Sequence, residues 1–182
     1  MTATSWTDAA ATPSQPAGSG LFTSGATVSI DAPASVVFDI ITSYSRYSEW
    51  NTWTPTLAFE DADGNVAAGA EGRLKTIMKA QNRAYDIPIE ILELDRTSET
   101  HKLAWRSKLL PGWAATAERV QTVTPVSGND GACEVKTWET MSGPAAYVFK
   151  YLMGVPKQLN ESNVNYLAEL KTYAEGKQAG QA

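Results

Sequence analysis

Two carboxylates flank a predicted hairpin, and they are the residues of this chain best suited to acid–base chemistry. Glu118 and Glu139 lie on either side of a Gly-rich turn at 127–131, and the alternating residues around the turn predict an antiparallel pair of strands. Counting inward from the turn places both glutamates on nearby rungs, close to Arg119. A carboxyl that faces inward among apolar side chains can act as a general acid or base. The alternative is a solvated or ion-paired surface carboxylate, since a bulge in either strand would exchange its two faces.

A second group of polar residues could assist such a reaction. Asn51 could orient a carbonyl, Arg73 could stabilise an enolate, and Tyr85 could donate a proton. Each of these residue types is equally common outside functional sites. The single histidine, His101, sits in a polar turn and is expected to be exposed and not catalytic. The candidate catalytic residues are therefore Glu139, Glu118, Arg73 and Tyr85.

The chain is rich in tryptophan, with 6 in 182 residues. Aromatic faces can hold a flat or polyunsaturated ligand and shield a reactive intermediate from water. The alternative is that these rings belong to the hydrophobic core. An apolar loop at 109–113, LLPGW, is expected to pack over the mouth of a cavity, because exposed loops are usually polar. The residues predicted to contact a ligand here are Trp50, Asn51, Trp53, Trp105, Trp113 and Tyr147.

The composition argues against several kinds of site. With one cysteine, Cys133, and one histidine, the chain cannot assemble a His/Cys zinc site or an intrachain disulfide. A metal site built from carboxylates alone stays open, but no acidic cluster has the spacing of a calcium loop, and no glycine loop suits a phosphate. The net charge of -5 and the lack of a Lys/Arg cluster argue against nucleic-acid binding. We therefore expect no metal and no cofactor.

The ends of the chain differ in composition from the middle. Residues 1–24 are rich in Ala, Thr, Ser, Pro and Gly and are predicted to form a flexible arm, although Trp6 could dock on a neighbouring surface. One domain is expected over 25–175, followed by a tail at 176–182. The chain shows no charged-then-apolar leader at its start and no apolar run that could span a membrane. Together with the lack of a disulfide, this pattern is typical of a cytoplasmic protein.

Hydrophobic periodicity predicts an α+β domain that ends in a long helix. Leu159, Tyr166 and Leu170 form an apolar stripe on this last helix, and Asn163 interrupts the stripe. An amide in that position needs a core partner or a ligand, so Asn163 and Tyr166 join the predicted ligand contacts. Strands are predicted over 26–30, 56–60, 73–78, 85–91, 103–107, 118–126 and 132–141, helices over 35–42, 44–49 and 156–175, and an Asp-Gly turn at 61–65.

Several segments resemble a known superfamily. The stretch IDAPASVVFDIITSYSRYSEWNTW is followed, in order, by HKLAWRSKLLPGW, ERVQTVTPV and WETMSGP. They are similar to the START/polyketide cyclase-like superfamily, also called SRPBCC, over about residues 26–174. The resemblance implies a helix-grip fold, in which a curved antiparallel sheet of about six or seven strands wraps around the C-terminal helix and encloses a cavity. The superfamily includes aromatases, cyclases, hydrolases, lipid carriers and ligand sensors, so the fold does not choose a function.

Resemblance and residues together favour a cofactor-independent enzyme of small-molecule metabolism, secondary metabolism included. It would bind a hydrophobic polyketide- or terpenoid-like substrate in the cavity and catalyse cyclisation, dehydration or isomerisation. The alternative is a non-catalytic carrier or sensor of a lipid or another hydrophobic metabolite. An inward carboxyl favours the enzyme, whereas a cavity lined only by apolar side chains favours the carrier. A partner-binding regulator is disfavoured because no large basic or apolar exposed face is evident, and a homodimer is left open.

Overall fold

The structure is a computed structural model that describes residues 2–59, 66–78 and 83–179. The predicted Asp-Gly turn at 61–65 lies outside these residues. The helical elements are α1 (Ala34–Thr42), η1 (Tyr44–Glu49), α2 (Pro144–Tyr151) and α3 (Val155–Ala179). The strands are β1 (Thr4–Trp6), β2 (Phe22–Ile30), β3 (Thr56–Phe59), β4 (Glu71–Met78), β5 (Arg83–Asp95), β6 (His101–Ser107), β7 (Thr116–Val126) and β8 (Asn129–Ser142).

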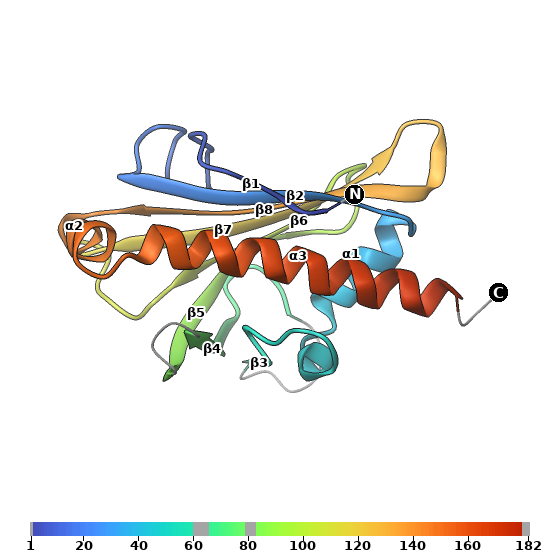
Figure 1. The fold of residues 1–182 in the computed structure, drawn as a ribbon. Helices are drawn as coiled ribbons and strands as arrows, with labels where there is room; N and C mark the ends of the chain where they lie inside the picture. The colour runs from blue at the N-terminus through green and yellow to red at the C-terminus, as the bar shows by residue number, and fades with distance from the viewer. Residues whose placement is uncertain (1, 60–65, 79–82, 180–182) are drawn as a thin grey trace.

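The described strands form one antiparallel sheet in the order β1-β2-β8-β7-β6-β5-β4-β3. The sheet curves strongly, so that β3, β4 and β5 turn under the strands at its other end (Figure 1). It has 8 strands in the described residues, against the six or seven expected, because the N-terminal segment adds β1 at one edge. Strands β7 and β8 form the predicted hairpin, with Arg119 opposite Glu139 and Glu118 opposite Thr140.

Helix α3 lies along the concave face of this sheet (Figure 1). Leu159, Tyr166 and Leu170 are buried, so the apolar stripe read from the sequence faces the sheet. Helix α3 begins with Val155 and Pro156, because a proline is tolerated in a first turn where its missing N–H is not needed. The predicted helix-grip α+β fold is confirmed. None of the helices in the described part of the chain combines the length and apolar character that crossing a membrane needs.

The N-terminal segment differs from the flexible arm that its composition predicts. Strand β1 pairs with β2, and the indole N–H of Trp6 donates to Oγ1 of Thr27 at 3.0 Å. The Trp6 ring lies directly over Gly25, where a Cβ atom would come within 2.4 Å of the ring, so only glycine leaves room for it. Farther along, Thr12 and Gln15 are buried against the outer face of the sheet. Composition could not reveal these contacts, because each depends on a partner distant in the sequence.

Candidate ligand cavity

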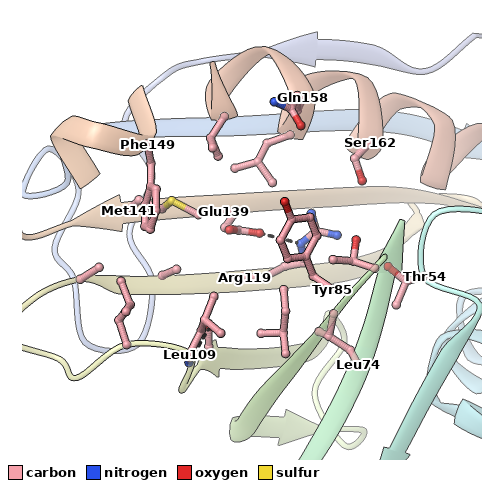
Figure 2. A pocket seen from close by; sticks show the side chains of 18 of the residues that line it. Thr54, Leu74, Tyr85, Leu109, Arg119, Glu139, Met141, Phe149, Gln158 and Ser162 are labelled. Atoms are coloured by element: carbon pink, nitrogen blue, oxygen red, sulfur yellow. Dashed lines mark hydrogen bonds and ion pairs between the residues drawn. The ribbon is translucent and has the colours of Figure 1, made fainter. Parts of the chain in front are cut away.

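A cavity of about 180 Å³ lies between the concave face of the sheet and the first half of α3 (Figure 2). Pockets for drug-sized ligands commonly have volumes of about 300–1,000 Å³. This cavity is smaller, so it suits a compact ligand. Most of its wall is apolar and comes from strands on one side and from α2 and α3 on the other. Apolar lining residues include Leu74, Ile87, Trp105, Leu110, Met141 and Leu159.

A buried ion pair interrupts this apolar wall. Nε of Arg119 on β7 donates to Oε2 of Glu139 on β8 at 3.3 Å, and the two side chains are only 10% and 8% exposed. The two residues face each other across the hairpin, and both line the cavity. Burying two charges is costly even when they are paired. A carboxylate and a guanidinium therefore stand in a mostly apolar cavity, where electrostatic interactions are stronger than in water.

Asn163 on α3 holds Arg119 from the other side. Nη2 of Arg119 donates to Oδ1 of Asn163 at 2.7 Å, and Nδ2 of Asn163 donates to the carbonyl oxygen of Ser24 at 3.0 Å. Asn163 is fully buried. It therefore has the core partners that its position in an apolar stripe requires, and it is not among the residues that line the cavity. Its amide links the helix to the charged pair.

The ion pair leaves groups free to meet a ligand. Among the described residues, Oε1 of Glu139 accepts no hydrogen bond and Nη1 of Arg119 donates none, since the bonds of the pair use Oε2, Nε and Nη2. Figure 2 shows both side chains at the wall of the cavity. One carboxylate oxygen and several N–H donors therefore lie at one place in the cavity.

Two other predicted site residues line the same cavity. Trp105 on β6 places its ring 5.7 Å from the guanidinium carbon of Arg119, a cation–π distance. Tyr85 on β5 projects into the cavity in Figure 2, and the Arg83 guanidinium lies 5.2 Å from its ring centre. Glu139, Trp105 and Tyr85 thus line one cavity, and Arg119 contacts the first two of them.

Glu118 lies on the opposite face of the sheet and not in the cavity, which corrects its assignment to the site. Its side chain is fully buried under the N-terminal segment. It accepts hydrogen bonds from Oγ1 of Thr12 at 2.6 Å, from the amide of Ser14 at 3.1 Å and from Oγ of Ser14 at 2.5 Å. The cause is strand parity: Glu118 precedes Arg119, and successive side chains point to opposite faces.

Arg73 is also outside the cavity. Its side chain is exposed on the outer face of β4 and pairs with Asp86 at 2.9 Å. Leu74 and Thr76 line the cavity. Because alternate residues of a strand share a face, Arg73 points to the opposite face of β4. The sequence alone did not establish the parity of this strand relative to the cavity.

Most of the other predicted aromatic contacts belong to the core or the surface. Trp50 is buried against Tyr166, with ring centres 5.3 Å apart. Trp53 is also buried and lies outside the lining, while Trp113 and Tyr147 are exposed and do not line the cavity either. Rings packed in a core and rings lining a cavity have the same sequence signature, which explains these differences.

Asn51 and Tyr166 are buried in the protein outside the cavity. Oδ1 of Asn51 accepts hydrogen bonds from the amides of Trp53 at 3.1 Å and Thr54 at 2.7 Å, and so shapes the turn after η1. Burial raises the pKa of Tyr166 to about 12, against a smaller opposing effect of the nearby Arg119 charge. Neither side chain is part of the cavity lining.

Several cavity residues were not predicted as site residues. The sequence indicates Arg119 only as a neighbour of the glutamates, although its position opposite Glu139 follows from the hairpin register. Met141 has the same strand parity as Glu139, which could have indicated it. Gln158 and Ser162, on the face of α3 that lines the cavity, had no signal, because they are ordinary polar helix residues. Within the described ranges, no three His, Cys, Asp or Glu side chains come together as metal ligands.

No family model matches the chain. A protein of Penicillium oxalicum, described as oxopyrrolidines biosynthesis cluster protein O, is 27% identical over 149 residues, which cover 69% of this chain and 73% of that protein. The aromatase/cyclase Zhui of Streptomyces superposes with a TM-score of 0.63 and 13% identity, covering 84% of this chain and 93% of its own. A STAR-related lipid transfer protein of Xanthomonas axonopodis superposes with a TM-score of 0.64 and 11% identity, covering 95% and 93%. The chain therefore has the helix-grip fold of the START/polyketide cyclase-like superfamily.

Proposed function

We propose that this protein is a cofactor-independent enzyme of small-molecule metabolism that binds a compact hydrophobic ketone in the cavity and moves a proton on it. The overall reaction would be a cyclisation, a dehydration or an isomerisation. The observation that carries the proposal is the Arg119–Glu139 pair, buried in a cavity whose wall is otherwise mainly apolar. A wall of apolar side chains alone would suffice for holding a hydrophobic molecule.

The chemistry follows from the free groups of the pair. Oε1 of Glu139 would take a proton from a carbon next to a substrate carbonyl, and the electrons of the C–H bond would move onto the carbonyl oxygen as an enolate. The N–H groups of Arg119 would stabilise the charge on that oxygen. The Trp105 ring would hold the substrate against the pair and exclude water. Tyr85 would return a proton where the product requires one.

The bonds that Arg119 already makes suit this role. Because Asn163 and Glu139 hold two of its nitrogens, the guanidinium has little freedom to reorient when charge develops on a substrate. Its contact with Trp105 limits its motion further. A donor that is already oriented stabilises a transition state without the cost of reorganisation.

The comparisons with known proteins support a function in small-molecule biosynthesis. The Penicillium relative is named for a biosynthesis cluster, and structural neighbours include aromatase/cyclases. The relative's name includes oxopyrrolidines, which are compact cyclic amides with a carbonyl group, and a cavity of about 180 Å³ fits molecules of that size better than long chains. We infer that a carbonyl compound from a biosynthetic route is the natural substrate.

The rival function is a carrier or sensor of a hydrophobic metabolite. It is supported by the fold shared with the lipid transfer protein and by the apolar wall of the cavity. The two functions differ in what happens to the ligand, because a carrier returns it unchanged.

Native mass spectrometry of protein purified from its source organism would separate these functions. We expect wild-type protein to carry a compact carbonyl compound that is largely lost from a Trp105→Ala variant. The released compound, incubated again with the protein, should change in mass on dehydration or in chromatographic retention on isomerisation. A ligand that is recovered unchanged under all conditions would identify a carrier and contradict the enzyme proposal.

A further inference from the structure

The exposed large apolar side chains of this protein are concentrated at one end. Trp113 and Leu152 are each 81% exposed, more than any other large apolar residue in the described part of the chain. Among the residues whose exposure the structure describes, five others lie beside them in the chain, and one, Val126, lies elsewhere, at the β7–β8 turn. We call the set the mouth surface, and it consists of Leu109, Trp113, Tyr147, Val148, Tyr151, Leu152 and Met153.

The two segments of the mouth surface are joined in space. The amide of Ala145, at the start of α2, donates to the carbonyl oxygen of Ala114 at 2.8 Å. Gly143 adopts a φ of 92° there, and a Cβ atom on it would come within 2.7 Å of the same oxygen. Figure 1 places α2 at one end of the molecule, beyond the start of α3. This close backbone approach brings the loop after β6 and helix α2 together as one surface.

The mouth surface reaches the cavity at two of its residues. Leu109 from the loop and Met153 from the α2–α3 connection are exposed and also line the cavity. Phe149, on α2, lines it as well. The exposed apolar patch therefore meets the ligand cavity at Leu109 and Met153.

The two chain segments that form the mouth surface carry only basic charges, whereas the chain as a whole is acidic. Between 107 and 117 and between 142 and 160 the sequence contains Lys108, Lys150 and Lys157 and no Asp or Glu, whereas the net charge of the chain is -5. Lys108 is paired with Glu71. Nζ of Lys150 is partly buried and donates to the carbonyl oxygen of Leu21 at 3.1 Å. Lys157 is exposed and forms no ion pair with any described residue, although Glu161 lies one helical turn after it.

We propose that the mouth surface docks on an anionic lipid bilayer, from which the apolar ligand enters the cavity or to which the product leaves. Exposed Trp, Tyr and Leu side chains with lysines at their border are the combination that suits the membrane interface. A large exposed apolar patch on a protein of this size marks an interaction surface. The prediction that no large apolar face is exposed is therefore wrong at this end. The docking serves an enzyme and a carrier alike, so it stands apart from the proposed catalysis.

Sedimentation with vesicles tests the proposal. We expect wild-type protein to sediment with vesicles of phosphatidylcholine and phosphatidylserine, and less with phosphatidylcholine alone. The double variant Trp113→Ser/Leu152→Ser should lose affinity by about tenfold or more, because it removes the two most exposed apolar anchors. The matched control is Val126→Ser, which removes an exposed apolar side chain at the β7–β8 turn and should bind as wild type does.

Charge gives a second, separate readout. Lys157→Gln should weaken binding to vesicles with phosphatidylserine and leave binding to phosphatidylcholine unchanged, and added salt should act in the same direction. The intrinsic fluorescence should shift to the blue on wild-type binding, and Trp113→Phe should remove most of that shift.

Three outcomes would overturn the proposal. If wild-type protein ignores both kinds of vesicle while it elutes as a dimer that Trp113→Ser/Leu152→Ser converts to a monomer, the mouth surface is a contact between two copies of this chain. If vesicles bind the double variant as well as the wild type, any membrane contact uses another face. An acidic partner protein that binds this surface, without vesicle binding, would likewise replace the membrane as its occupant.

Discussion

Glu118 and Arg119 are consecutive residues of β7 whose charged groups are buried on opposite faces of the sheet. Arg119 faces α3 and pairs with Glu139 at 3.3 Å, whereas Glu118 faces outward and is covered by Thr12 and Ser14. One strand thus connects the N-terminal segment to the cavity, and each charge has partners on its own side. Alternation along a strand produces this arrangement without any special geometry.

Removal of the N-terminal segment should destabilise the protein. Deleting residues 1–19 removes β1, the Trp6 contact with Thr27, and the hydrogen bonds to Glu118. We expect the Tm to fall by about 5 °C or more, since hydrogen bonds to a charged group are among the stronger ones. Calorimetry measures the change. An unchanged Tm would mean that the segment does not dock in solution. Ser19→Ala, which removes an exposed hydroxyl and its local hydrogen bond to the carbonyl oxygen of Pro16, serves as a control.

Asn163→Leu should cost about 2 kcal/mol of unfolding free energy, because Nη2 of Arg119 and the carbonyl oxygen of Ser24 both lose their partner. Ser162→Ala is the matched control: this neighbour lines the cavity, and its removal should change stability by less than about 0.5 kcal/mol. Urea denaturation gives both values. Equal stability of the two variants would show that the Asn163 amide does not hold Arg119.

Substitutions of Trp105 and Tyr85 should have different effects on ligand binding and on turnover. Trp105→Ala removes ring area from the cavity wall and the contact with Arg119, so it should weaken ligand binding by about tenfold or more and broaden the product range. Tyr85→Phe keeps the ring and removes the hydroxyl, so it should preserve binding and slow turnover. Calorimetric titration and rate measurements separate the two effects. The assignment of Tyr85 would be wrong if its variant lost binding and kept turnover per bound ligand.

The thiol of Cys133 should be inert in the folded protein. Burial raises its pKa to about 12, so the group stays a neutral thiol at about pH 8, where an ordinary cysteine is partly thiolate. A thiol reagent should therefore label Cys133 only at the rate at which the protein opens, and quickly in denaturant. Fast labelling of the native protein would show that the strand around Cys133 is open to solvent.

The sequence predicted the parts of the fold that depend on local pattern. The β7–β8 hairpin and the apolar stripe of α3 follow from periodicity, whereas the hairpin alone left open whether Glu139 faces the cavity or the solvent. The contact of Thr12 with Glu118 could not be predicted, because it joins hydroxyl and carboxylate groups 106 residues apart. The prediction of Arg73 as a site residue was wrong, because the local sequence does not determine which face of a strand lines a cavity.

The aromatic residues show the same limit. Nothing in the sequence around Trp50 and Trp105 distinguishes a core ring from a cavity ring, yet Trp50 packs in the core and Trp105 lines the cavity. Their separation depends on where α3 leaves a space, and that space is set by side-chain volumes from many elements. Trp113 is exposed for a different reason, because it lies in a loop at the end of the molecule beside α2.

The central claim is that Glu139 removes a proton from a ligand held in the cavity, and hydrogen exchange measures this step without the natural substrate. A small cyclic ketone in D₂O, which exchanges its α-hydrogens slowly in buffer, should take up deuterium faster with wild-type protein, and NMR follows the exchange. Glu139→Gln should bind the same ketone and lose about a hundredfold or more of this acceleration. Glu134→Gln, on the same strand but outside the cavity, should match wild type. Equal acceleration by Glu139→Gln and wild type would contradict the claim.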